Sequence, residues 1–244
     1  MGEGRLKETF VAWMDGCLYG WVVVLLDCQT RSSSLLLVPS FPEALQITAN
    51  AAIVAVDIPI ELMEEARPGG RDCDILARRL LGDSRASSIF SPPVRKAFQG
   101  TSYEEALRIN RSSSSHGIGL SRQCFGIFRK FSEVDQVITQ KLQTRVIEVH
   151  PEVCFYEMNN GRPLQHGKKS KAGLEERKSL LINARVALDD GWLKKYQKSQ
   201  VASDDILDAC AACWTAERCL QGQAICIPVV PPTDSKGLRM EMWR

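Results

Sequence analysis

Apolar residues in the first part of the chain form short runs that are separated by turn residues. The runs at Thr9–Met14, Gly20–Asp27 and Ser34–Val38 follow one another at hairpin-like spacing, and Asp15-Gly16 ends the first. Runs of this length between turn residues predict β-strands. We therefore expect three consecutive strands that pair as an antiparallel meander.

Two later runs are apolar at almost every position. Ala51–Val56 precedes Asp57, and Arg145–Val149 carries Glu148 among valine and isoleucine. A continuous apolar run predicts a strand that is buried on both faces of a sheet. Phe41–Ala49, which lies between the third and fourth strands, is a short helix candidate.

The stretch between the fourth and fifth strands, at about residues 61–142, has a helical and loop-rich pattern. Two adjacent prolines in Ser87–Pro93 forbid a helix there and predict a rigid loop. Two further helices follow the fifth strand. The helices predicted after the fourth strand are Arg71–Leu81, Tyr103–Asn110, Phe131–Leu142, Leu174–Leu188 and Ser203–Leu220.

This element order predicts the α/β class, with three antiparallel strands, two parallel strands and flanking helices. Periodicity alone establishes little more, but the same order is found in ribonuclease-H-like folds. In such a fold the residues from about 61 to 142 are a helical insertion between strands four and five. No repeat and no shift in composition marks a boundary, so we expect one domain over residues 1–244.

The composition is that of an ordinary globular protein, at 44% hydrophobic and 25% charged residues with a net charge of +2. This near balance does not by itself indicate a nucleic-acid partner. The longest apolar stretch, Trp21–Leu26, is too short to span a bilayer, and the N-terminus has no signal-peptide core. We therefore expect a cytoplasmic protein that does not enter the membrane.

The cysteines are nine in number and scattered through apolar segments, which predicts reduced thiols rather than disulfides. Cys210 and Cys213 have the spacing of a zinc-binding pair. They lie among alanines in a predicted helix, and no histidine follows them. Small core residues are therefore the favoured interpretation.

Carboxylates stand where three of the predicted strands end. Asp15 closes the first strand, Asp57 the fourth and Glu148 the fifth. The carboxyl ends of neighbouring strands face the crevice where α/β sheets bind ligands. Several carboxylates in one place repel one another, and a divalent cation with oxygen ligands resolves that repulsion. The pattern therefore predicts a metal site at this edge of the sheet.

The last long helix adds further acids near its start. Asp205 and Asp208 are three residues apart and share one helix face, with Asp204 before them. Asp208 lies a turn deeper, among apolar residues where an unpaired carboxylate is costly, which favours a function. Asp204 and Asp205 have an alternative, structural interpretation. Ser203 can cap the helix, and the two aspartates would then stabilise the positive end of its dipole.

The other candidates have structural alternatives as well. Asp15 before Gly16 can be a simple turn residue. Glu152 is expected to start a helix. For His150 and His166 a surface or packing role is favoured over proton transfer.

Basic residues exceed acidic ones between Arg67 and Lys96, by seven to three or +4. Such a stretch either attracts an anionic ligand or forms solvated helix faces. Arg71 and Arg78 are seven apart on one side of a helix, and Arg95 follows two prolines. One hypothesis is that these three form a phosphate-facing rim. The alternative is that Asp74 pairs with Arg71 or Arg78.

Several short motifs, taken in order over about Val11 to Trp243, resemble the protein family catalogued as domain of unknown function 429. Each motif is weak alone, and their order and spacing make them specific. They are Asp15-Gly-Cys-x-x-Gly-Trp21, Val56-Asp-Ile-Pro-Ile60, Arg71-x-Cys-Asp-x-x-Ala-Arg78, Ser87-Ser-x-Phe-Ser-Pro-Pro-Val-Arg95, Glu148-Val-His-Pro-Glu152, Asp204-Asp-Ile-Leu-Asp-Ala209, Trp214-Thr-Ala216 and Gly237-Leu-Arg-Met-Glu241.

The resemblance implies a ribonuclease-H-like fold and nuclease activity, since the family is described as predicted nucleases. The pair Asp205 and Asp208 is also similar to the last acidic motif of Holliday-junction resolvases. The implied metal ligands are Asp15, Asp57, Asp205 and Asp208, with Glu148 as an additional ligand or base. One departure is Leu18, which stands where the family has arginine.

The leading hypothesis is phosphodiester hydrolysis of DNA or RNA with Mg²⁺ or Mn²⁺. Arg71, Arg78 and Arg95 would contact the substrate backbone. The first rival is a non-catalytic module that binds nucleic acid or protein through a degenerate site. The second is phosphoryl transfer to a small molecule, which lacks support because no Gly-x-x-x-x-Gly-Lys loop is present.

Overall fold

A five-stranded mixed sheet forms the centre of the molecule in the computed structural model, which describes residues 10–186 and 203–244. The strand order is β3-β2-β1-β4-β5. The first three strands are antiparallel neighbours, and β4 and β5 continue the sheet parallel to β1. This confirms the predicted fold class, and the order is consistent with a ribonuclease-H-like sheet. The strands are β1 (Phe10–Gly16), β2 (Trp21–Asp27), β3 (Ser33–Val38), β4 (Ile53–Val56) and β5 (Val146–Glu148).

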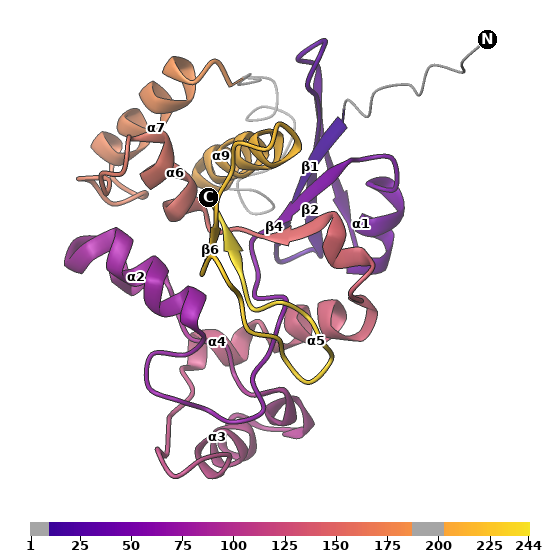
Figure 1. The fold of residues 1–244 in the computed structure, drawn as a ribbon, viewed down its shortest axis with the longest axis vertical. Helices are drawn as coiled ribbons and strands as arrows, with labels where there is room; N and C mark the ends of the chain where they lie inside the picture. Colours follow the sequence, from indigo (N-terminus) through magenta and orange to yellow (C-terminus); the bar gives the residue numbers. More distant parts are fainter. Residues whose placement is uncertain (1–9, 187–202) are drawn as a thin grey trace.

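Helices cover both faces of this sheet (Figure 1). One face packs against α6 (Pro151–Met158), α7 (Lys171–Asn183) and α9 (Ser203–Leu220), and α9 lies directly on β1 and β4. The opposite face packs against α1 (Phe41–Ile47) and α5 (Phe128–Val137). The core is therefore two apolar layers that the sheet separates.

The segment between β4 and β5 is the predicted helical insertion. It continues from β4 through a loop into its first helix and returns to β5 by a short 3₁₀ turn (Figure 1). Besides α5, its elements are α2 (Asp72–Arg85), η1 (Ala86–Ser88), η2 (Arg95–Gln99), α3 (Tyr103–Ser112), α4 (Arg122–Gly126) and η3 (Leu142–Thr144).

Alternation along the strands decides which side chains meet which helices. Trp13 on β1 and Ala55 on β4 belong to the apolar layer beneath α9, whereas Met14 and Val56 belong to the opposite layer. Successive side chains of a strand point to opposite faces. Residues two positions after Trp13 and Ala55 therefore point toward α9.

Some elements differ from the sequence prediction. The helix expected to stop at Gly82 continues to Arg85, although Gly82 itself has φ 62° and interrupts the helical backbone. This conformation suits glycine, which has no Cβ to clash. Apart from the short 3₁₀ turns, the elements that were not predicted are α4 and the hairpin of β6 (Cys226–Ile227) with β7 (Met242–Trp243), whereas α6 begins beside Glu152 as expected. The predicted helix end at Leu188 lies outside the described residues.

The cysteines are free thiols in the structure, and the helices bear on whether the chain spans a membrane. All nine cysteines are free thiols, and Cys210 and Cys213 are buried in α9. Their place in the apolar layer confirms the interpretation as small core residues. Among the residues that the structure describes, none of the helices combines the length and the apolar character needed to traverse a bilayer.

Candidate metal centre

The ends of β1 and β4 bring two aspartates to one edge of the sheet. Met14 is paired with Val56, and the backbone N–H of Asp57 donates to the carbonyl of Met14 at 3.1 Å. Asp15 and Asp57 therefore follow at neighbouring positions. By the alternation described above, both carboxylates lie on the side of the sheet that α9 covers.

Helix α9 brings the other acids to the same place. Asp205 and Asp208 are in its first two turns, and this helix contacts β1 and β4. Asp208 is 5% exposed, while Asp15, Asp57 and Asp205 are half-buried. The strand and helix carboxylates therefore lie on the same side of the sheet, but within the described residues no three of them have ligand atoms within 4.8 Å of one another.

Burial and neighbouring carboxylates raise the pKa of Asp15 and of Asp57. Burial raises the pKa of Asp15 to about 7, and the charges of Asp205 and Asp208 add to the shift. Burial also raises the pKa of Asp57 well above its usual value, with contributions from Asp15 and Asp208. Charges of one sign in a poorly hydrated place disfavour ionisation. The group as a whole therefore favours a bound cation.

A lysine that the sequence analysis did not single out supplies positive charge here. Lys168 Nζ lies 2.9 Å from Oδ2 of Asp208 and 3.6 Å from Oδ2 of Asp204. Burial raises the pKa of Asp208 to about 6, and Lys168 opposes that shift. Lys168 is in the loop before α7, forty residues from Asp208, and no local pattern connects the two.

One oxygen of the group has no partner that would explain its burial. Within residues 10–186 and 203–244, Oδ1 of Asp208 is buried and makes no hydrogen bond. Buried polar atoms are normally satisfied, and a bound ion is one explanation for an exception. Carboxylate oxygens are the ligands that Mg²⁺ and Mn²⁺ prefer, so the donor set fits such an ion.

Glu148 lies on the opposite face and has a different environment. Ile147 and Val149 belong to the layer beneath α9, so Glu148 between them points away from it. Its two carboxylate oxygens accept from Arg71 at 2.6 and 2.7 Å, and one also accepts from the backbone N–H of Ile60 at 2.9 Å. Its charge still raises the pKa of Asp57. Glu148 thus points away from α9, but it lines one cavity with Asp15 and Asp57.

The expectation that Arg71 faces a phosphate is wrong. Its side chain is fully buried and binds three carboxylates, those of Glu61 (3.1 Å), Asp74 (2.7 Å) and Glu148 (2.6 Å). Asp74 also accepts from the backbone N–H of Arg71 at 2.9 Å and so caps α2. The alternative pairing with Asp74 is confirmed for Arg71.

Part of this ion cluster could itself hold a metal. In the described part of the chain, Cys73, Asp74 and Glu148 are the one group of three whose ligand atoms all lie within 4.8 Å of one another. All three are buried. Burial raises the pKa of Cys73 well above its usual value, which keeps the thiol protonated, and Arg71 already supplies a cation to both carboxylates.

Arg78 also makes contacts inside the protein, and its partners there are neutral. It donates to the carbonyls of Gly69 (2.7 Å) and Ile89 (3.1 Å) and to the hydroxyl of Ser91 (2.8 Å). It does not pair with Asp74. Its guanidinium therefore fixes the loop before α2 to the segment after η1.

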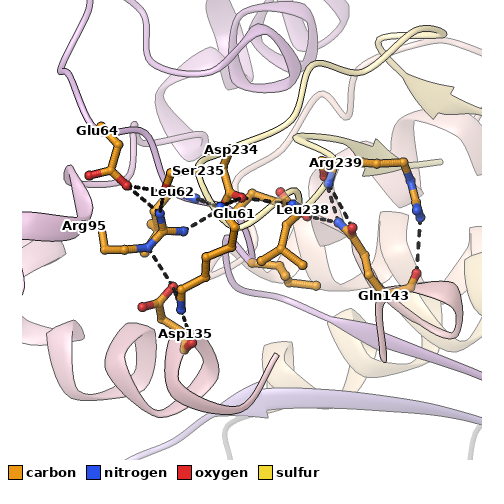
Figure 2. A network of polar contacts seen from close by, with 12 residues as sticks. Glu61, Leu62, Glu64, Arg95, Asp135, Gln143, Asp234, Ser235, Leu238 and Arg239 are labelled. Carbon is orange, nitrogen blue, oxygen red and sulfur yellow. Dashed lines mark hydrogen bonds and ion pairs between the residues drawn. The ribbon is translucent and has the colours of Figure 1, made fainter. Parts of the chain in front are cut away.

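Arg95 is the third arginine of the predicted rim, and it too is occupied. Figure 2 shows its guanidinium between the carboxylates of Glu64, Asp135 and Asp234, at 2.6, 3.0 and 2.6 Å. Asp234 also accepts the backbone N–H groups of Leu62 and Leu238. Arg95 thus attaches the C-terminal segment to the helical insertion, and the terminal nitrogens of all three arginines of the predicted rim bind protein atoms.

Two adjoining cavities border the aspartates. The first, about 190 Å³, is lined by Asp15 and Asp57 together with residues of the Arg71 cluster. The second, about 330 Å³, is lined by Asp57, Asp208 and Lys168 and by Arg85 after the kink in α2. Both cavities are lined by Asp57, Phe90 and His150.

The two histidines have the structural roles that were favoured. His150 caps α6, with its Nδ1 accepting from the backbone N–H of Glu152 at 3.3 Å. Burial lowers the pKa of His150 to about 4, so it is neutral near pH 7. Glu152 starts α6 and pairs with the buried Arg177. His166 is exposed.

Leu18, which stands in place of the family's arginine, is 94% exposed in the turn between β1 and β2. A side chain at this position extends into solvent instead of filling the cavities beside Asp15. The substitution therefore leaves the arrangement of the aspartates intact.

Comparison with known proteins gives one match. The family model described as Protein of unknown function (DUF429) matches residues 14–233, which is most of the chain. No curated protein and no solved structure matches the chain.

Proposed function

We propose that this chain, which belongs to the family described as Protein of unknown function (DUF429), is a divalent-metal-dependent phosphodiesterase that acts on nucleic acid. The observation that carries the proposal is the placement of Asp15, Asp57, Asp205 and Asp208 on one side of the sheet, where burial, together with the charges of Asp205 and Asp208, raises the pKa of Asp15 to about 7. Such a group at the end of a sheet, open to a cavity, is a typical site for metal-assisted chemistry.

The four aspartates would hold Mg²⁺ or Mn²⁺, with the unpartnered Oδ1 of Asp208 as one ligand atom. When bound, the ion would activate water and stabilise the negative charge that develops at a phosphodiester. Asp15 and Asp57 follow neighbouring strands, and Asp208 is on α9, which contacts both strands; this arrangement supports their holding one ion together. Neutral His150 borders both cavities without adding charge.

A second candidate is a binding module that keeps this fold without catalysis. The observation that favours it is Lys168, whose ammonium group already compensates Asp208 at 2.9 Å. An internal cation in this position can stabilise the acidic group in the absence of metal.

The test is cleavage of single-stranded, duplex and branched DNA and RNA in Mg²⁺ and in Mn²⁺. We expect Asp57→Asn and Asp208→Asn each to abolish cleavage while the far-UV circular dichroism spectrum stays unchanged. Asp83→Asn is the matched control, because Asp83 is exposed and makes no hydrogen bond or ion pair within the described residues. A wild-type protein that binds these nucleic acids but cleaves none in either ion would support the binding module instead.

A further inference from the structure

The second cavity combines the metal-side carboxylates with a basic wall. Asp57 and Asp208 line one part of it, and Lys168 and Arg85 line another. Its volume of about 330 Å³ lies at the lower end of the range for small-ligand sites. Ser84 and Ser87 also line this cavity.

Arg85 is the one cation of the basic stretch from Arg67 to Lys96 that lines this cavity. Its Nε donates to the carbonyl of Leu164 at 3.1 Å, which fixes the direction of the side chain. Within the described residues, its two Nη nitrogens make no hydrogen bond or ion pair. This differs from Arg71, Arg78 and Arg95, whose terminal nitrogens all bind protein atoms.

The kink of α2 explains why Arg85 reaches the cavity. Gly82 has a non-helical backbone, so the last residues of α2 and the short η1 leave the direction of the first part of the helix. Arg85 then crosses to the loop before α7, where its guanidinium lies beside Gly167. Lys168 is the next residue of that loop, so the two cations approach the cavity together.

The side chain of Lys168 is 39% exposed, and its ammonium group forms an ion pair with Asp208. When a divalent ion compensates Asp208, the charge of Lys168 is no longer needed there. An ammonium group carries three donors on a flexible stem and so can turn to an anion in the same cavity.

We propose that the cavity between Arg85 and Lys168 is a phosphate subsite, which binds a substrate phosphate next to the one that reacts at the aspartates. This inference rests on the proposed function and names the part of the substrate that this wall recognises. A guanidinium with two unpaired terminal nitrogens matches the geometry of a phosphate. Contacts of this kind position nucleic acid without reading its sequence.

The matched variants are Arg85→Gln and Arg79→Gln. Arg79 lies on the same helix, is exposed and makes no hydrogen bond or ion pair in the described part of the chain. Binding of a fluorescent single-stranded oligonucleotide is measured by anisotropy in Ca²⁺ over a salt series, with its integrity checked on a gel. We expect Arg85→Gln to weaken binding about three- to tenfold and to lower the salt slope by about one unit. Arg79→Gln is expected to match the wild type.

Lys168→Gln and Arg85→Lys complete the experiment. Lys168→Gln is expected to lower the salt slope as Arg85→Gln does, and Arg85→Lys to restore it, because a cation at position 85 is kept. Inorganic phosphate should compete with the oligonucleotide in the wild type and less in Arg85→Gln. Equal affinities and slopes for Arg85→Gln and Arg79→Gln would overturn the subsite, even if the wild type cleaves nucleic acid. Conversely, a wild type that binds with this Arg85 dependence but never cleaves would keep the subsite and remove the nuclease proposal.

Discussion

Substitution of the buried Arg71 tests whether its guanidinium compensates the negative charges of the carboxylates around it. Its guanidinium donates to both oxygens of Asp74, to both oxygens of Glu148, and to the carboxylate and carbonyl of Glu61. None of these four side chains is more than 2% exposed. The change to make is Arg71→Met, which keeps much of the volume and removes the charge and all the donors.

Removing one partner from a buried ion cluster leaves charges that water cannot reach, and typically costs about 3–5 kcal/mol. Burial already raises the pKa of Glu61 and Glu148, and Arg71 lowers both. Without Arg71 both pKa values rise further above those of the unfolded chain. The folded state then holds protons that the unfolded chain has released, so stability falls as pH rises. We expect a loss of about 3–5 kcal/mol at pH 8 and a clearly smaller loss at pH 5.

The assay is urea denaturation at both pH values, with Arg78→Met as the matched control. Arg78 donates to two carbonyls and a hydroxyl, none of which titrates between pH 5 and 8. Its loss is expected to cost about 1–3 kcal/mol equally at both pH values. A loss below about 1 kcal/mol for Arg71→Met, or a loss that does not change with pH, would refute this account of the buried cluster.

Three further predictions concern other charges. Asp15→Asn in EDTA is expected to raise the free energy of unfolding at pH 8 by about 1–2 kcal/mol and to have no effect near pH 4. The reason is that the raised pKa of Asp15 makes its ionised form unfavourable in the folded protein at pH 8, whereas near pH 4 this cost is absent. A variant that is less stable than the wild type at pH 8 in urea denaturation would contradict this. Lys168→Met is expected to tighten Mn²⁺ binding about tenfold by calorimetry, because it removes the cation that competes for Asp208; weaker binding would show that Lys168 supports the ion. Arg95→Ala is expected to lower the free energy of unfolding by about 1–3 kcal/mol and to leave the salt slope of oligonucleotide binding unchanged, since its partners are protein carboxylates; a slope reduced by about one unit would restore Arg95 as a phosphate contact.

The strands could be predicted because their signal is local. Each apolar run bounded by turn residues became a strand, and the order of runs was enough for the α/β class. The acids Asp15 and Asp57 were found because they end two such runs. Asp208 was found because a carboxylate in an apolar helix is costly.

The face on which Glu148 lies could not be predicted. The fifth strand is buried on both faces, so apolar residues point to both sides of the sheet. Its sequence therefore has no alternation of apolar and polar residues that shows which side each residue faces. Only the register shows that Ile147 and Val149 share the layer beneath α9 with Trp13 and Ala55. The grouping of Glu148 with the aspartates followed from strand ends alone.

The distant partners of the arginines could not be predicted from local sequence patterns either. The spacing of Arg71 and Asp74 indicates their pairing, because residues three apart on a helix are neighbours. The other partner of Arg71, Glu148, is 77 residues away, and Arg95 meets Asp234 across 139 residues. A count of basic residues treats all of them alike, although in the described part of the chain the terminal nitrogens of Arg71, Arg78 and Arg95 bind protein atoms and those of Arg85 do not.

The two acidic groups on opposite faces of the sheet are compensated by different cations, and this difference bears on where a metal would bind. Arg71 is fully buried and makes six hydrogen bonds to its three acids, so displacing it would leave a rigid guanidinium without partners. Lys168 is 39% exposed and, within the described residues, pairs with Asp208 at 2.9 Å and Asp204 at 3.6 Å, so its flexible side chain can turn to water more readily than that of Arg71. Although Cys73, Asp74 and Glu148 are closely spaced, their cation is fixed, whereas the cation of the aspartates is exchangeable. Exchange of a cation is what reversible metal binding requires, and this favours the aspartates beneath α9 as the metal centre.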